Sequence, residues 1–174
     1  MSEPIMEIDE DGTKVWYLNG EYHREDGPAI EYENGHNEWW FNGHCHREDG
    51  PAIEYENGST VWCINGLRHR EDGPAREYLD GHKEWWINGE YHREDGPAIE
   101  YANGSKFWWF NGLRHREDGP AVENPDCYKL WYLNGQLHRE DGPAVESADG
   151  DEEWWLNDTQ YSKEEYRLLT FFKE

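Results

Sequence analysis

Large apolar residues alternate with small or polar ones in short runs along the chain. Ala52–Tyr55 is one such run, and its two-residue periodicity predicts a β-strand. Val61–Ile64 predicts the return strand. Between them, Asn57-Gly58 is typical of a two-residue type I′ hairpin turn, because both residues tolerate a positive φ. A second turn at Asn65-Gly66 predicts a short third segment, so each unit is expected to add two firm strands and one short one.

The same pattern returns with a constant period of 23 residues. An Asn at the second turn recurs at Asn19, Asn42, Asn65, Asn88, Asn111, Asn134 and Asn157. A Trp stands three residues before each of them, at Trp16, Trp39, Trp62, Trp85, Trp108, Trp131 and Trp154. The heptapeptide HREDGPA begins four residues after each of the first six, at His23, His46, His69, His92, His115 and His138. Such self-similarity indicates a repeat architecture, in which stacked neighbours supply the burial that a lone hairpin lacks.

We therefore expect an all-β fold over residues 1–161, an elongated single-layer antiparallel sheet of about seven hairpin repeats. The Trp that never varies is assigned to the structural core formed by the stacked repeats. In a two-residue turn it would lie opposite the repeat His. Residues 1–12 resemble the second half of a repeat and are expected to cap the first one.

The pattern stops at the C-terminal end, where residues 162–174 are predicted to form a capping helix. Ser162 and Glu165 have the spacing of a capping box. Tyr166, Leu169 and Phe172 fall near one helical face. We expect this short helix to cover the last open edge of the sheet, and the alternative is a helix that binds a partner.

The chain is strongly acidic, with 16 Lys and Arg against 39 Asp and Glu and a formal net charge of −23. Aromatic residues make up 16% of it, which favours a folded sheet over a disordered acidic chain. Nucleic acids and anionic membranes are bound through clustered Lys and Arg, so we expect no direct binding to either. The charge favours a basic protein partner. The alternative is that the charge only keeps a Trp-rich sheet soluble.

Cys45, Cys63 and Cys127 are odd in number and show no CxxC spacing, which argues against a disulfide framework or a zinc site. The first residues lack the basic and apolar segments of a signal peptide. No segment approaches the roughly 18 apolar residues of a membrane helix. We expect a cytoplasmic protein.

The 23-residue period, the Tyr-x-Asn-Gly turn and the aromatic return strand are similar to MORN repeats. The HREDGPA block resembles a variant of that family found in proteins of bacteria, phages and large DNA viruses. The resemblance implies an elongated antiparallel sheet that serves as a scaffold, a dimerisation surface or a binding module, in a bacterial or phage-infected cell. It also implies roles such as immunity protein or antitoxin. Catalysis in the family belongs to attached domains.

Each of the six HREDGPA blocks contains a His and two carboxylates, which are residue types found in metal sites and in acid–base catalysis. An active site needs one set of catalytic residues, whereas six identical copies at fixed spacing are what the folding of a repeat protein requires. We therefore expect no catalytic residues, no metal site and no cofactor. Arg24 and its equivalents are expected to bridge to a carboxylate of the adjacent repeat. The first carboxylates of the blocks are candidate partner contacts: Glu25, Glu48, Glu71, Glu94, Glu117 and Glu140.

The residue after the constant Trp varies and points to the other face. It is Tyr17, Trp40, Cys63, Trp86, Trp109, Tyr132 or Trp155. These residues form either a second packed layer or an exposed aromatic strip. Because Trp is favoured in binding hot spots, Trp40, Trp86, Trp109 and Trp155 are further candidate partner contacts. Elsewhere Arg76 replaces an otherwise aliphatic position.

The leading hypothesis is a non-catalytic acidic binding module that inhibits a basic nucleic-acid-handling protein, such as a nuclease, a deaminase or a CRISPR-type effector. Seven two-strand units at about 4.8 Å per strand would span roughly 67 Å. The 23 net charges would then be spaced on the order of 3 Å apart, against about 1.7 Å in duplex DNA. A phage anti-defence (anti-CRISPR) protein or a toxin-immunity protein could act by such mimicry.

Two alternatives remain from other classes. The first is a structural scaffold or self-assembly module, including a homodimer, which predicts concentration-dependent self-association. The second is a metal- or ligand-binding repeat protein that uses the His and carboxylate rows, which predicts stoichiometric metal in the purified protein.

Overall fold

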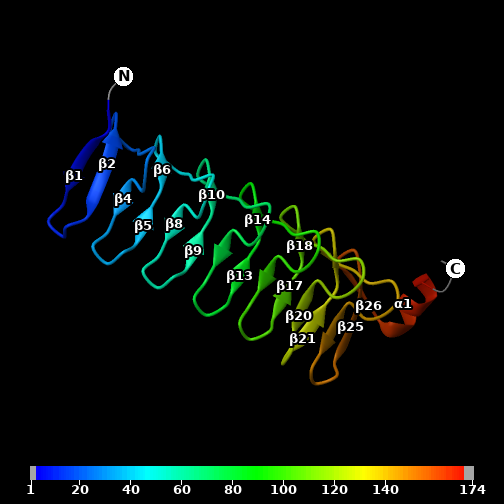
Figure 1. Cartoon of the computed structure of the whole chain (residues 1–174). Helices are drawn as coiled ribbons and strands as arrows, with labels where there is room; N and C mark the ends of the chain where they lie inside the picture. The colour runs from blue at the N-terminus through cyan, green and yellow to red at the C-terminus, as the bar shows by residue number, and fades with distance from the viewer. Residues whose placement is uncertain (1–2, 171–174) are drawn as a thin grey trace. The chain divides into compact units, whose positions relative to one another are not determined.

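The computed structural model describes residues 3–170. The chain falls into two compact units, Met1–Glu90 and Tyr91–Glu174, and both are built from the same repeated hairpin (Figure 1). The predicted fold class is confirmed: the structure is an antiparallel array of β-hairpins with one short C-terminal helix.

In the first unit, each long hairpin pairs with the next through antiparallel strands. Their order in the sheet is β1 (Ile5–Ile8), β2 (Lys14–Leu18), β4 (Ile30–Glu31), β5 (Asn37–Glu38), β8 (Ile53–Glu54), β9 (Thr60–Val61), β12 (Arg76–Glu77) and β13 (Lys83–Glu84). In the second unit the order is β16 (Ile99–Glu100), β17 (Lys106–Phe107), β20 (Val122–Asn124), β21 (Tyr128–Leu130), β24 (Val145–Ser147), β25 (Glu152–Leu156) and β26 (Thr159–Tyr161).

The short third segment of each repeat forms a small two-stranded ribbon at the end of the hairpin opposite its tip (Figure 1). The ribbons pair β6 (Trp40–Phe41) with β7 (His44–Cys45), β10 (Cys63–Ile64) with β11 (Leu67–Arg68), β18 (Trp109–Phe110) with β19 (Leu113–Arg114), and β22 (Tyr132–Leu133) with β23 (Gln136–Leu137). In the first repeat β3 (Glu21–Tyr22) pairs with β2 itself. The remaining short strands are β14 (Trp86–Ile87) and β15 (Glu90–Tyr91).

The predicted return strand is therefore interrupted at its Trp. The residues before Trp62 belong to the main sheet, and those after it belong to the ribbon. The backbone of Trp62 joins the two parts, because its N–H donates to Ala75 O (2.7 Å) and its carbonyl accepts from His69 N (3.2 Å). The expected position of the Trp opposite the repeat His is confirmed by this second bond.

The prediction of a type I′ turn at Asn57-Gly58 is wrong. Tyr55 N donates to Ser59 O (2.9 Å) across a three-residue loop, and within that loop only Gly58 has a positive φ, +83°. This is the geometry of a type I turn followed by a left-handed Gly. The I′ conformation occurs instead at Asn65-Gly66, where both φ angles are positive (50° and 80°) and Ile64 pairs with Leu67.

The ribbons also connect successive repeats within each unit. The Gly N–H of each second turn donates to a carbonyl of the previous ribbon, as from Gly43 to Tyr22 O (2.9 Å) and from Gly66 to Cys45 O (2.8 Å). The same bond joins Gly135 to Arg114 O (2.8 Å) in the second unit. Equivalent positions are thus linked at every step.

The most deeply buried residues are the alanines of the HREDGPA blocks, which have no exposed surface: Ala29, Ala52, Ala75, Ala98, Ala121 and Ala144. Aliphatic residues beside them, such as Ile30 and Val122, are also buried. All seven constant Trp residues are half-buried, and Trp39 packs against the cluster that contains Ala52. The small Ala side chain lets the Trp lie close to the sheet.

The predicted C-terminal helix is α1 (Lys163–Thr170). The capping box is formed, since Ser162 N and Ser162 Oγ both donate to Glu165 Oε2 (2.9 and 2.7 Å). Tyr166 is buried on β25, with its ring 4.7 Å from that of Trp154. Its hydroxyl donates to Arg139 O (2.8 Å) and accepts from Gly142 N (3.2 Å). Phe172 lies outside the described residues.

Candidate functional site

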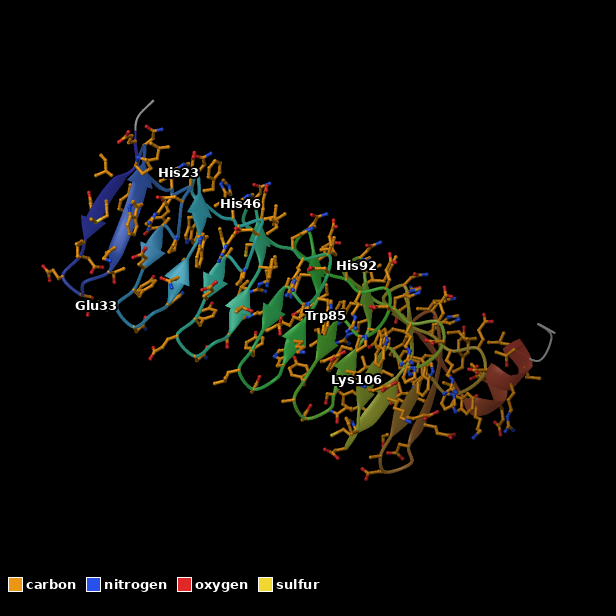
Figure 2. The ribbon with its side chains drawn as sticks, viewed as in Figure 1. His23, Glu33, His46, Trp85, His92 and Lys106 are labelled. Carbon is orange, nitrogen blue, oxygen red and sulfur yellow. The ribbon has the colours of Figure 1, made fainter. Side chains whose placement is uncertain are left out.

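Two faces of the hairpins can be distinguished from strand alternation. We call the side that carries the constant Trp residues and the HREDGP segments the loop face. The opposite side, which carries Ile30, Trp40 and their equivalents, is the aromatic face. Figure 2 shows His23 and His46 at the ribbon end of the first unit, whereas Glu33 lies at the opposite end, at a hairpin tip.

Each HREDGP segment is held in shape by its Arg. Arg24 Nε donates to Asp26 (2.8 Å), and Arg24 Nη1 donates to Pro28 O (3.1 Å) and to Glu31 (2.7 Å). The same three bonds recur in all six copies. Glu31 starts the next repeat, so the expected bridge to a carboxylate of the adjacent repeat is confirmed. The Asp of the same block is a second partner that was not predicted.

The guanidinium also covers the constant Trp. Its central carbon lies 3.9–4.1 Å from the indole centre in the pairs Arg24–Trp16, Arg47–Trp39, Arg70–Trp62, Arg116–Trp108 and Arg139–Trp131. A cation over an indole face is attracted by the ring quadrupole. The Trp therefore packs against the guanidinium, which binds the Asp of its own block and the Glu that starts the next repeat.

The consequence is that the Asp of each block is fixed by the Arg yet largely open to solvent, whereas the Glu before it lies 3.6–3.9 Å from Nε2 of the repeat His. We call the Glu and Asp that follow each of these Arg residues the acidic row. The Glu side chains are 79–88% exposed, apart from Glu140 at 50%. The Asp side chains are 82–86% exposed. The bond from Arg24 and its positive charge hold the pKa of Asp26 below its ordinary value, and the same holds for Asp49, Asp72, Asp95 and Asp118.

Between successive segments of the second unit lie open grooves. One, of about 790 Å³, has Trp131 and Leu133 among its lining residues, together with Glu117, Asp118, Glu140 and Asp141. A second, of about 980 Å³, has Trp108 and Phe110 with Glu94, Asp95, Glu117 and Asp118. Two Arg residues also line each groove, Arg116 and Arg139 in the first and Arg93 and Arg116 in the second. The carboxylates and apolar side chains match a Lys or Arg side chain, whose stem is apolar and whose end is charged.

The repeat His residues bind the backbone rather than pointing freely outward. His23 Nδ1 accepts the N–H of Asn42 in the next repeat (3.2 Å), so Nδ1 is engaged, and Nε2 lies 3.8 Å from Glu25. The Asn N–H of each following repeat donates in the same way to Nδ1 of His46, His69, His92, His115 and His138. Within residues 3–170, no group of three or more His, Cys, Asp or Glu is arranged to hold a metal ion.

On the aromatic face the four variable Trp residues are half-buried. Trp40, Trp86 and Trp155 each donate Nε1 to the Glu two residues earlier, at 2.8, 3.0 and 2.8 Å. Trp109 has Phe107 at that position, and its buried Nε1 has no hydrogen-bond partner in the described part of the chain. These residues thus lie on the face opposite the acidic row, and a single flat partner cannot contact both sets.

No helix among the described residues is long and apolar enough to cross a membrane. Comparisons with protein-family models and with curated proteins find no match to this chain.

Proposed function

We propose that this chain is a non-catalytic binding module that inhibits a basic nucleic-acid-handling protein by presenting the acidic row in place of a phosphate backbone. The observation that carries this proposal is the set of three bonds made by the Arg of each HREDGP segment, which we call the Arg clamp. In this clamp the Arg of each block holds the Asp of the same block in one conformation while leaving that Asp largely exposed. A rigid charged surface binds with less loss of side-chain entropy than a flexible one.

The distribution of charge supports the loop face as the binding face. In each repeat the acidic row and the clamped Glu supply three carboxylates against one Arg, an excess of two negative charges. Lys14, Lys83, Lys106 and Lys129 face a clamped Glu in the strand register and reduce this excess to one where they occur. The aromatic face of the first unit instead carries Arg68 and Arg76 beside Glu38 and Glu84. The carboxylates are therefore concentrated on one side and not spread evenly over both.

The spacing of the charge refines the comparison with nucleic acid. Two strands per repeat at about 4.8 Å give a step of roughly 9.6 Å. One to two excess charges per step then give on the order of one per 5–10 Å. A single DNA strand carries about one per 3.4 Å and the duplex about one per 1.7 Å. The acidic row is thus closer to one phosphate strand than to a duplex, which favours an enzyme that grips one strand in a basic channel.

The test begins with capture of proteins from a host lysate and elution with a salt gradient. A captured basic enzyme is then assayed on its nucleic-acid substrate with added purified protein. We expect inhibition that is relieved by excess single-stranded nucleic acid. Capture of the protein by itself alone would favour the scaffold alternative.

A matched pair of variants tests the face. Glu25→Gln, Glu48→Gln and Glu71→Gln together remove three charges from the acidic row, at positions with 79–88% exposure. Glu10→Gln, Glu33→Gln and Glu56→Gln remove three exposed charges at the tips of the long hairpins. We expect at least tenfold weaker inhibition and a smaller salt dependence only from the first set. Equal weakening by both sets would contradict binding through the row.

The kinship with MORN repeats is likewise a proposal, supported by the period and by the Tyr-x-Asn-Gly turn of the long hairpin. The family roles of immunity protein, antitoxin or anti-defence protein agree with an inhibitor of this kind.

A further inference from the structure

The aromatic face of the first unit carries a row of rings with a gap in it. Tyr17 and Tyr22 lie 5.2 Å apart, and Tyr22 and Trp40 lie 5.6 Å apart, measured between ring centres. At the next two positions of the same zigzag the chain has Cys45 and Cys63. Other repeats place Trp or Tyr at the position of Cys63. Two small thiols thus stand where the pattern places larger side chains.

The missing rings leave a shallow cavity of about 390 Å³ that is open to solvent. Trp40 and Trp86 line it together with Cys45, Cys63 and the aliphatic Val61. Both thiols are buried, with 7% and 5% exposure. Small-molecule sites are typically about 300–1,000 Å³ and mostly apolar, with a few polar groups that orient the ligand. This cavity has that size and that lining.

Two guanidinium groups supply the polar part. Arg68 and Arg76 both line the cavity. Arg68 lies over the ring of Trp86 (4.9 Å), and Arg76 lies over the ring of Tyr78 (4.3 Å). The position of Arg76 is occupied by Ile in the repeats on either side, at Ile53 and Ile99. Arg76 therefore interrupts the repeat pattern at the same place as the two thiols, whereas Arg68 has an equivalent in Arg114.

Glu84, which is opposite Arg76 in the strand register, is already paired. It accepts from Trp86 Nε1 (3.0 Å) and lies 3.5 Å from His82 Nε2. The acidic row is on the other side of the sheet, and charges farther than a Debye length of about 8 Å are largely screened at physiological ionic strength. Glu38 and Glu84 lie on the same face but do not line the cavity, and Arg68 and Arg76 are the charged residues among its lining.

We propose that this cavity is a binding site for a small planar aromatic carboxylate. The ring of the ligand fills the gap between Trp40 and Trp86, above the thiols of Cys45 and Cys63. Its carboxylate is held by Arg68 and Arg76, since guanidinium groups match carboxylate geometry and remain charged. This site is separate from the acidic row and does not depend on the proposed inhibition.

The thiols provide a built-in reporter of occupancy. A hydrogen bond from Cys45, together with the charge of Arg68, lowers the pKa of Cys63, whereas the same thiol pairing and burial raise the pKa of Cys45. We expect Cys63 to be alkylated faster than Cys45. Cys127 is exposed and belongs to the second unit, so it serves as an internal reference for the alkylating reagent.

The probe is indole-3-acetate, added to the full chain and followed by calorimetry and by the rate of alkylation at each cysteine. We expect saturable binding with one site per chain, and alkylation of Cys63 slowed at least fivefold at saturation while that of Cys127 is unchanged. Acetate lacks the ring, and tryptamine carries the same ring with an ammonium group. Neither is expected to bind. Absence of saturable binding by indole-3-acetate, or equal affinity for tryptamine, would overturn the proposal.

The repeats themselves supply the control variants. Cys63→Trp introduces the residue found at Trp40 and Trp86 and fills the gap, and Arg76→Ile introduces the residue of Ile53 and Ile99. Each should weaken binding of indole-3-acetate at least tenfold. If Cys63→Trp does not fold, the affinity of Arg76→Ile for indole-3-acetate alone tests the site. Unchanged affinity in the folded variants would overturn the site, whereas the triple Glu variant of the acidic row should bind the probe normally.

Discussion

The guanidinium of Arg47 lies over the indole of Trp39, with its central carbon 4.1 Å from the ring centre. In this position its Nε donates to Asp49 (2.9 Å), and its Nη1 donates to Pro51 O (3.1 Å) and Glu54 (3.0 Å). One side chain thus joins the Trp, the exposed segment and the next hairpin.

We expect Arg47→Ala to lower the free energy of unfolding by about 2 kcal/mol, because it removes the stacking and three bonds together. Arg47→Lys should recover little of this loss, since a single ammonium cannot form the guanidinium fork. Urea unfolding followed by Trp fluorescence measures both. Lys14→Ala, which removes one half-exposed contact to Glu31 (3.4 Å), should change stability by less than about 0.5 kcal/mol. A comparable loss in the control would refute the clamp.

The lowered pKa of Asp49 predicts the pH dependence of stability. Its hydrogen bond from Arg47 places the folded pKa below the unfolded value of about 3.9. The folded state then binds fewer protons than the unfolded state in this range, so the stabilisation is complete above pH about 4 and is lost as the pH falls through the lowered pKa. Carbon-detected NMR titration of the Asp carboxyls should show Asp49 titrating low in the wild type. It should return to the ordinary value in Arg47→Gln, and an ordinary value in the wild type would contradict the bond.

The two Asn-Gly dipeptides of one repeat should differ in their response to mutation. Asn65 has φ +50°, and its N–H donates to His46 Nδ1 (3.1 Å). Asn65→Ala keeps this backbone bond but places Ala, which has no polar side chain to stabilise a positive φ, in the left-handed region. It also removes the contact between Asn65 Oδ1 and His46 Nδ1 (3.1 Å). We expect a loss of about 2 kcal/mol.

Asn57 provides the comparison, because it lies in the other turn and its φ is not positive. Asn57→Ala removes one bond, from Ser59 N to Asn57 Oδ1 (2.9 Å), and should cost about 1 kcal/mol or less. Thermal unfolding of the two variants under identical conditions is the measurement. Equal losses would mean that the two turns have the same backbone conformation.

The C-terminal cap depends on one hydroxyl group. Tyr166→Phe keeps the ring packed 4.7 Å from Trp154 but leaves Gly142 N–H and Arg139 O without their partner. An unsatisfied buried group costs about 1–3 kcal/mol, so exchange of the Gly142 amide should accelerate at least fivefold. Tyr161→Phe on β26 is the control. No acceleration at Gly142 would show that the helix contributes little at this edge.

Much of this fold could be predicted from the sequence because the constant 23-residue period identifies the structurally equivalent positions. The hairpins, the bridge from Arg24 to the next repeat and the capping box at Ser162 were all predictable from local patterns. The conformations of Asn57-Gly58 and Asn65-Gly66 were not. The same dipeptide fits either turn, and the loop length is set by the pairing of Ile53 with Val61, which depends on packing across the sheet.

The contacts of the Arg in each block and the cavity at Cys63 could not be predicted from the sequence, for two different reasons. The Asp of each block could have been recognised as an Arg partner only by knowing that the segment folds back on itself. The gap at Cys63 and the cation at Arg76 are both visible as departures from the repeat. Only the structure shows that they line the same cavity, because they lie on different strands, β10 and β12. Whether the acidic row binds a partner stays a prediction.

The bonds from the Gly of each second turn to the previous ribbon, such as Gly66 to Cys45 O, join the same two positions at every step within a unit. Loss or duplication of one complete 23-residue interval in the gene would therefore leave each flanking ribbon with an equivalent partner. Unequal recombination between the repeats could change the number of carboxylates in the acidic row without disturbing any single hairpin. The length of the charged surface can accordingly change during evolution through a change in the number of repeats. Point mutations such as those at Cys63 and Arg76 instead change the side chains at a single site.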